Sequence, residues 1–306
     1  GESVGAAIPN NDWWRSKVKL LEDKAQPLST VAPGIYYEKD GYWPVLKLVW
    51  MMQSLGFYMP IMDKMRQAGG WDSIHFIDLC AGSGLTRIAG GPGKPERILL
   101  GSALIGANES RFDHYHFVEP DAVRAAALQA RLAVLHNPAK FTVHATTANQ
   151  AIPAIAAALK SHRNAHFLAF VDPEGLSETT VPDLDPLLAG RGDFIFNFHS
   201  TAVKRVPEAL ASAFFGDSDW PRDGSRADLL KFFCDKLRAH GRPRSTSIHI
   251  EAGVGSYEYE IVYAAAQTKG DNPWLANFAK VVEQRMAGMD GKMLRDIIEG
   301  GQTALF

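Results

Sequence analysis

Two glycines and two acids placed at the ends of apolar runs suggest a binding site for a small molecule. The stretch HFIDLCAGSG (residues 75–84) carries Asp78 near the end of one run, followed by Gly82 and Gly84. Glycine at a strand end lets the backbone turn tightly and approach a ligand closely. A second run, YHFVEP, ends near Glu119, where a carboxylate can accept hydrogen bonds from both hydroxyls of a ribose. These residues predict a site for a nucleotide-like ligand.

A dinucleotide or a triphosphate matches this turn poorly. The dinucleotide fingerprint requires a third glycine three residues after Gly84, where the sequence has Arg87. No Gly-Lys-Ser/Thr closes a phosphate-binding loop either. A nicotinamide-dependent oxidoreductase is therefore the least favoured class. The remaining candidate is a ligand with an adenosine-like part and no pyrophosphate.

A third acidic turn, FVDPEG (residues 170–175), follows another apolar run. Asp172 ends this run, and Pro173 fixes a turn in which the carboxylate and a backbone carbonyl can both face an acceptor. Such a pair of acceptors suits an exocyclic amine, whose reaction depends on positioning more than on covalent catalysis. Glu174 could act as a general base or bind a cation, and it could equally be a solvated turn residue.

Basic and polar residues near the same predicted edge could bind an anionic substrate. The segment FNFHSTAVKR follows a further apolar run and contributes Asn197, His199, Lys204 and Arg205. They could orient a phosphate backbone, although a polar loop after a strand commonly carries such residues. The Gly/Pro-rich segment 87–101 contributes Arg87, Lys94 and Arg97. It is predicted to be a mobile loop that closes over the pocket, followed by a helix that Ser102 could cap.

The elements that must position these residues alternate between strands and helices. Strands are predicted at residues 74–79, 115–120, 141–145, 166–172 and 193–198, with helices at 44–62, 121–135 and 149–161, where Asn149 could be the N-cap. This alternation predicts an α/β fold with a mainly parallel, doubly wound sheet covered on both faces. Residues 245–252 and 256–266 predict a C-terminal antiparallel hairpin, followed by a last helix over 272–289.

Composition limits the class of protein. The chain has 306 residues, 46% of them hydrophobic and 22% charged, with a formal charge of -2, as in an ordinary soluble protein. A surface that binds polyanions everywhere is excluded, while a local basic patch remains open. We expect residues 1–70 to form an N-terminal extension with one helix, and residues 71–306 the ligand-binding domain. The apolar segment 44–62 contains Lys47, Gln53 and Pro60, so a buried helix is favoured over a membrane span.

The cysteines, histidines and N-terminal tryptophans carry weaker signals. Two cysteines cannot form a disulfide framework, so a cytoplasmic protein is expected, with Cys80 as a packed residue. No histidine lies at a spacing typical of metal ligands, and no metal site is predicted. Trp13 and Trp14, beside three basic residues, could stack on single-stranded nucleic acid, although a packed arm is favoured.

The motifs, taken in order, resemble those of two nested families. DLCAGSG followed by VEPD resembles the S-adenosylmethionine (SAM) site of class I SAM-dependent methyltransferases. That resemblance implies a Rossmann-like class I methyltransferase fold in which Glu119 binds the ribose. It also implies that the first turn contacts the methionine part of SAM through Asp78, Ala81, Gly82, Ser83 and Gly84.

The narrower resemblance covers about residues 36–286. DLCAGSG, GSALIGA, FVEPD, FVDPEG, DFIFNF and FFGDSDW are together similar to the three-Cys-motif partner family. The family is methyltransferase-like, and its name implies a partner, a radical-SAM protein with a three-Cys motif. This chain departs from the family at two places. TTAN (146–149) lacks the acid that would bind the adenine amino group, leaving Thr147 or Asn149, and Glu174 replaces an aromatic residue.

Two functions follow from the residues and the resemblance together. The favoured one is SAM-dependent methyl transfer to a nucleic acid or nucleotide, with Asp172, Pro173 and Glu174 at the acceptor. The alternative is a non-catalytic subunit that binds SAM or a nucleoside beside a radical-SAM protein. The missing acid at position 147 and the missing aromatic residue at position 174 both favour the alternative. Without the aromatic residue, a flipped base would lack a stacking partner.

Overall fold

The computed structural model describes residues 11–39, 41–136, 138–251 and 258–300. Its main sheet has seven strands in the order β6-β5-β2-β7-β8-β10-β9. The first five are parallel, and β10 is antiparallel to both of its neighbours. The bounds are β2 (Ser73–Asp78), β5 (His114–Val118), β6 (Phe141–His144), β7 (Ala165–Val171), β8 (Gly192–Phe198), β9 (Arg244–Glu251) and β10 (Glu258–Ala265). The predicted Rossmann-like, mainly parallel sheet with a C-terminal antiparallel hairpin is confirmed.

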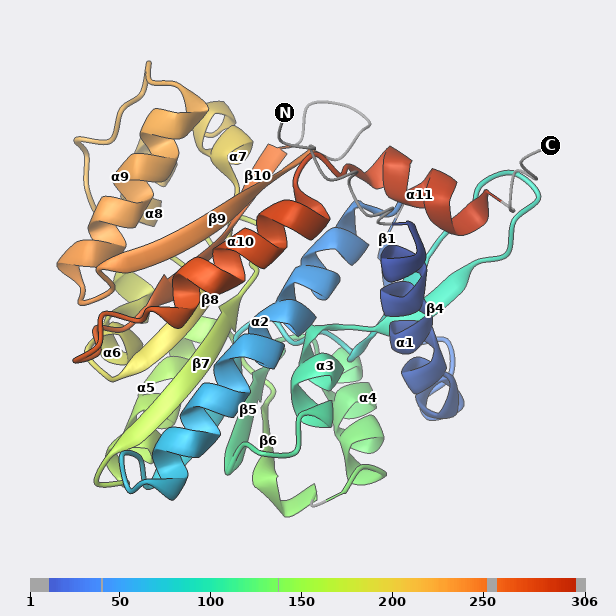
Figure 1. Ribbon diagram of the computed structural model, residues 1–306, viewed down its shortest axis with the longest axis horizontal. Coiled ribbons are helices and arrows are strands. Elements are labelled where there is room, and N and C mark those ends of the chain that lie inside the picture. The colour runs from blue at the N-terminus through green and yellow to red at the C-terminus, as the bar shows by residue number, and fades with distance from the viewer. Residues whose placement is uncertain (1–10, 40, 137, 252–257, 301–306) are drawn as a thin grey trace, which may run out of the picture.

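Helices cover both faces of this sheet because successive strand residues point to opposite sides. Phe76 belongs to the core beneath one helical layer and Ile77 to the core beneath the other. Figure 1 shows α2 and α10 side by side across one face. That layer contains α1 (Asn11–Ser29), α2 (Trp43–Gln67), α3 (Ser102–Asn108), α4 (Ala122–Ala133), α10 (Trp274–Met286) and α11 (Gly291–Glu299). The other contains α5 (Ala148–Lys160), α6 (Asp185–Leu188), α7 (Ser200–Arg205), α8 (Glu208–Phe215) and α9 (Arg226–Ala239).

The segment 87–101 is not the loop that its glycines and prolines predict. It contributes to β3 (Leu85–Ile88) and supplies β4 (Arg97–Leu100), which pair in an antiparallel hairpin, and β1 (Tyr37–Lys39) pairs with β3. Leu85, Ile88, Leu99 and Leu100 of β3 and β4 are buried in the core that α1 helps to cover, so packing outweighs the local turn signal. Only residues 89–96 connect the two strands, and the N–H of Gly91 there donates to Glu299 Oε1 at 3.0 Å.

The predicted buried helix over 44–62 corresponds to α2. By length and composition α2 could cross a membrane, but 67% of its most apolar window is buried inside the protein. The expected packing of the N-terminal arm is confirmed for Trp14, which is fully buried and donates to the carbonyl of Arg285 at 3.2 Å. Trp14, Trp50 and Phe76 share one core, so the boundary expected at residue 70 runs through that core.

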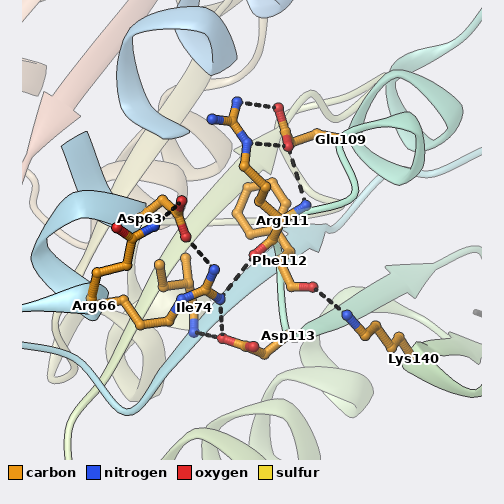
Figure 2. A network of polar contacts seen from close by, with 9 residues as sticks. Asp63, Arg66, Ile74, Glu109, Arg111, Phe112, Asp113 and Lys140 are labelled. Atoms are coloured by element: carbon orange, nitrogen blue, oxygen red, sulfur yellow. Dashed lines mark hydrogen bonds and ion pairs between the residues drawn. The ribbon is translucent and has the colours of Figure 1, made fainter. Parts of the chain in front are cut away.

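A polar network fixes the C-terminal end of α2 to the amino ends of the central strands (Figure 2). Arg66 ion-pairs with Asp63 and, through Nη1, with Asp113 Oδ2 at 2.8 Å. The same Asp113 oxygen accepts the backbone N–H of Ile74 at 2.8 Å. These contacts fix α2 relative to β2 and β5. Its opposite end, which carries Lys47, therefore lies at the carboxyl edge of the sheet.

Candidate functional site

A cavity of about 380 Å³ opens at the carboxyl ends of β5, β2 and β7. In the main sheet, β5 and β6 lie on one side of β2, and the later strands β7 and β8 lie on the other side. The strand order therefore reverses at β2, and doubly wound folds bind ligands at this switch point. The lining includes the glycine turn after β2, the acid after β5 and the acid after β7. Its charged residues are Lys47, Glu119, Asp121, Arg124, Asp172, Glu174 and Glu178, five acids against two bases.

The glycine turn forms the floor of the cavity. Gly82 and Gly84 have φ of +61° and +91°, a backbone conformation that favours glycine. A Cβ on Gly84 would lie 2.9 Å from Leu104 of α3, so this position also allows the close approach of the helix. Arg131, fully buried, donates to the carbonyl of Ser83 at 2.8 Å and holds the turn from behind. Ala81, Gly82, Ser83 and Gly84 all line the cavity.

Asp78 does not reach the cavity wall. Its carboxylate is fully buried and accepts the N–H of Cys80 at 2.9 Å and the hydroxyl of Ser102 at 2.6 Å. Burial raises its pKa to about 7. The expected contact with the methionine part is replaced by a structural role, because Asp78 joins the glycine turn to the start of α3. Ser102 thus belongs to the first turn of α3 and bonds Asp78, and the N-cap residue is Gly101.

Glu119 lies on the β5 side of the cavity. Its Oε2 accepts the N–H of Gly82 at 2.9 Å and its Oε1 accepts the N–H of Asp121 at 3.0 Å. Burial raises the pKa of this carboxyl, while those two N–H groups and Arg124 act in the opposite direction. A carboxylate has about four acceptor positions, so two remain for hydroxyl groups of a ligand.

Asp172 lies on the β7 side and has two partners. Lys47 of α2 forms an ion pair with Oδ2, and Asn197 Nδ2 donates to Oδ1 at 2.7 Å. Burial by itself would raise the pKa of Asp172, but the charge and hydrogen bond of Lys47, helped by Asn197, lower it below the usual value. Both charged side chains line the cavity, with Lys47 9% and Asp172 17% exposed. The sequence-based interpretation had left Lys47 out of the site.

Residues around the Asp172 turn complete this end of the cavity. Glu174 lines the cavity, while the Pro173 carbonyl lies 3.2 Å from His199 Nε2. Tyr37 of β1 also lines it, and burial followed by the Glu174 carboxylate raises its pKa. Lys39 lies over the rings of Tyr37 and Trp43, at 4.2 and 5.3 Å from their centres. Burial, and then the charge of Lys47, lowers the Lys39 pKa.

The residues expected at the adenine are partly in place. Thr147 lines the cavity and occupies the N-cap of α5, the position expected for Asn149. Asn149 lies in the first turn, where its side-chain oxygen accepts the Thr147 hydroxyl at 2.5 Å. It does not line the cavity.

The basic residues expected to bind substrate are not brought to the cavity. Arg87 pairs with Glu38 and Glu96, and Arg97 Nη1 lies 2.7 Å from Glu22 Oε2. Lys94 is exposed in the β3–β4 turn. Lys204 donates to the carbonyl of Gly224, and Arg205 is exposed at the end of α7. Asn197 and His199 are not among the cavity-lining residues. They contact the site indirectly, Asn197 through the Asp172 carboxylate and His199 through the Pro173 carbonyl.

The polar residues of the site that went unrecognised in the sequence include Tyr37, Lys47, Asp121, Arg124 and Glu178. Lys47 did have a visible signal, as a lone cation in an apolar helix. Such a charge requires a partner when the helix is buried. The identity of that partner, 125 positions away, depends on how α2 lies across the sheet.

No protein-family model matches the chain, and no curated protein sequence matches it significantly. Solved structures with a similar arrangement include the Legionella pneumophila protein LPL1258 of the DUF519 family model, with 12% identity over 81% of this chain and 94% of that one, at a TM-score of 0.48. The O-methyltransferase TomG of Streptomyces achromogenes in complex with SAM has 12% identity over 87% of this chain and 93% of TomG, at a TM-score of 0.38. Trm1 of Pyrococcus horikoshii in complex with SAM has 10% identity over 69% of this chain and 55% of Trm1, at a TM-score of 0.38. At these values the similarity concerns the fold alone.

Proposed function

We propose that the chain is a SAM-dependent methyltransferase whose acceptor is a nucleic acid or a nucleotide. The supporting observation is the order of groups along the cavity. A glycine turn without a third glycine lies between Glu119 on one side and the Asp172–Lys47 pair on the other. Glu119 suits a ribose, and Asp172 and Lys47 suit the atom that receives the methyl group.

The cavity fits SAM better than it fits a dinucleotide. SAM supplies an electrophilic methyl group on a positively charged sulfur. Five carboxylates and two cations among the lining residues favour a cationic ligand and disfavour a pyrophosphate. The volume of about 380 Å³ lies within the range usual for small-molecule sites. Glu119 would hold the ribose, and the backbone from Ala81 to Gly84 would contact the methionine part.

The ion pair changes the role expected of Asp172. An unpaired carboxylate would orient an exocyclic amine on its own, but here the ammonium of Lys47 takes one oxygen and Asn197 the other. The pair can bind an acceptor from two directions, because the carboxylate retains lone pairs and the ammonium retains N–H donors. Asp172 would accept a proton of the acceptor group while Lys47 donates to a neighbouring oxygen or nitrogen. Catalysis would then come from positioning.

The acceptor class rests on an aromatic and cationic group formed by residues of β1 and the start of α2. Tyr37, Lys39 and Trp43 place aromatic rings and a cation next to one another close to Asp172. Alternating stacking surfaces and positive charge are typical of contacts to single-stranded nucleic acid. Tyr37 would thereby supply an aromatic surface that position 174 does not.

The binding-only alternative, a partner of a radical-SAM protein, is favoured by one observation. Asp172 already has partners at both oxygens, as expected of a structural carboxylate. Calorimetric titration with SAM, S-adenosylhomocysteine and NAD tests the ligand, with binding expected for the first two and none for NAD. Transfer of label from methyl-labelled SAM to RNA, DNA and lysate protein tests the reaction. Incorporation into nucleic acid supports the proposal, SAM binding with no incorporation anywhere supports the alternative, and NAD binding without SAM binding contradicts both.

A further inference from the structure

The hairpin of β9 and β10 carries four metal-ligating side chains on one face. His249 and Glu251 lie two residues apart on β9, and Glu258 and Glu260 lie two apart on β10. The register places Glu251 opposite Glu258 and His249 opposite Glu260. Because strand residues two apart share a face, all four side chains project to the same side.

Glu260 fixes the orientation of the imidazole. His249 Nδ1 lies 2.9 Å from Oε1 of Glu260, a carboxylate that is 2% exposed and also pairs with Arg226. An ionised carboxylate only accepts, so Nδ1 carries the proton and donates. In the neutral ring the other nitrogen, Nε2, then carries the lone pair and can act as a ligand. A histidine held by a buried carboxylate in this way is the arrangement usual for metal-binding imidazoles.

The free nitrogen faces two further carboxylates. Nε2 lies 3.5 Å from Glu251 Oε1 and 3.9 Å from Glu258 Oε1, and one ligand atom from each residue lies within 4.8 Å of the other two. Like charges directly opposite on paired strands destabilise a sheet. Arg226 pairs with Glu260, on the other side of the imidazole from these two glutamates. The two outer carboxylates and the nitrogen lone pair therefore converge on one point with the charge pattern of a cation site.

We propose that His249, Glu251 and Glu258 bind a divalent transition metal of the zinc type. Tetrahedral zinc with bonds of about 2.0–2.2 Å places neighbouring ligand atoms about 3.3–3.6 Å apart. The observed 3.5 and 3.9 Å need only small movements of two partly exposed glutamates to reach that spacing. One nitrogen and two carboxylate oxygens leave a fourth position for water, as in open zinc sites. An imidazole ligand favours zinc over magnesium, which prefers oxygen. This site is one that the sequence did not predict.

The metal would link the end of β9 to the start of β10 at the carboxyl edge of the sheet. The backbone of Glu258 is bonded to Thr201 Oγ1 at 3.1 Å through both its N–H and its carbonyl. Thr201 follows His199, which contacts the turn of Asp172. Binding of the metal would therefore stiffen the wall behind the acceptor end of the cavity. The metal site itself does not depend on the function proposed for that cavity.

Titration of the chelator-treated full chain with Zn²⁺ alone tests the site. We expect saturable binding that Glu251→Gln and Glu258→Gln each weaken at least about tenfold, since even a lost supporting contact commonly costs that much. Glu283→Gln removes the same charge from exposed α10, which lines the same hollow but supplies none of the three ligands, and should weaken binding much less than either ligand variant.

A second measurement separates the site from the two cysteines and from loss of folding. Zn²⁺ should raise the melting temperature of the wild type and of Glu283→Gln, but not that of the double variant Glu251→Gln/Glu258→Gln. The double variant should melt as the metal-free wild type does or somewhat higher, because a repulsion has been removed. Equal zinc affinity in the wild type and the double variant would overturn the proposal, as would a wild type that does not bind zinc.

Discussion

At the scale of single residues, the chemistry of the cavity depends on carboxylates that the protein treats differently. Asp78 is buried behind the glycine turn with its pKa raised to about 7, whereas Lys47 and Asn197 keep Asp172 charged. Glu119 lies between these extremes, with two backbone donors and two acceptor positions open to a ligand. The three acids look alike in the sequence, and their neighbours distinguish a buried structural acid, an ion-paired acid and an acid with acceptor positions open to a ligand.

The first prediction concerns Asp172 and Lys47. Lys47→Met should lower the free energy of unfolding by about 3–5 kcal/mol, because a mostly buried carboxylate loses its partner. The double variant Lys47→Met/Asp172→Asn should recover most of this loss, as urea unfolding of the four proteins would measure. Asp172→Asn alone should reduce methyl transfer about 100-fold while SAM affinity changes less than about threefold. A loss of SAM binding as large as that of a Glu119 variant would instead place Asp172 in contact with the cofactor.

The second prediction concerns Glu119. Glu119→Ala should weaken SAM binding at least about tenfold, because charge-assisted bonds to two ribose hydroxyls are lost. Titration calorimetry measures the affinity, and a melting curve shows whether the fold is intact. Glu283→Gln, an exposed acid on α10, serves as the control and should bind SAM normally. Normal affinity in a fully folded Glu119→Ala would show that the ribose binds elsewhere.

At the scale of elements, close packing between α3 and β2 sets the shape of the turn. A Cβ on Gly106 of α3 would lie 2.2 Å from Cε1 of the Phe76 ring. We therefore predict that Gly106→Ala destabilises the protein by about 1–3 kcal/mol through overpacking. Gly56→Ala is the matched control, because Gly56 lies inside α2 with nothing within 4 Å of the added methyl group. That variant should be neutral or more stable by up to about 1 kcal/mol in the same urea experiment. Equal effects at the two sites would contradict the close approach.

Because β3 and β4 form a paired hairpin, the predicted lid is reduced to the turn between them, residues 89–96. The paired residues of β3 and β4 should exchange their amide protons slowly, while Gly93 and Glu96 in the turn should exchange rapidly. Gly91 should be protected, because its N–H donates to Glu299 of α11. Glu299→Ala should increase exchange at Gly91 without changing exchange in β2, as hydrogen exchange monitored by NMR would show. Slow exchange at Gly91, Gly93 and Glu96 in this variant would exclude any lid movement there.

At the scale of the whole molecule, the two layers bury ionisable groups that make stability depend on pH. In the core, Nδ1 of His75 in β2 lies 3.5 Å from Nε2 of His116 in β5. Burial, followed by the neighbouring histidines, lowers their pKa values to about 3 and about 4. The unfolded chain binds protons at these sites below about pH 6.5 and the folded chain does not. Their contribution therefore falls as the pH drops from about 6.5 toward 4, by about 2 kcal/mol for each histidine at pH 5.

Buried Asp78 acts in the opposite direction, since a raised carboxyl pKa makes the fold more stable as the pH falls. The test is therefore a difference between proteins. Between pH 7 and pH 5, His75→Gln/His116→Gln should lose about 4 kcal/mol less stability than the wild type, measured by urea unfolding. His136→Gln, an exposed histidine, should behave as the wild type. Parallel stability curves for all three proteins would mean that the buried pair does not resist protonation.

Much of the fold follows from local patterns in the sequence. Apolar runs of strand length separated by helical periodicity were sufficient to predict the strands of the main sheet and the antiparallel hairpin, because burial on both faces of a parallel sheet demands such runs. The glycine turn, Glu119 and Asp172 were predicted together, since the carboxyl ends of neighbouring strands share one edge. The same reasoning failed for β3 and β4, whose glycines and prolines indicate a loop until the helices that cover them are known.

The sequence by itself therefore determined the order of the elements and the edge of the sheet at which ligands would bind. Only the tertiary structure decided which charges meet there. The ion pair of Lys47 with Asp172 joins residues 125 positions apart, and the burial of Asp78 depends on how α3 packs over the turn. The group formed by His249, Glu251 and Glu258 depends on the register of β9 and β10. Spacing along the chain carries no information on contacts that arise when separate elements pack, because their geometry is set by the combined burial of all the core residues.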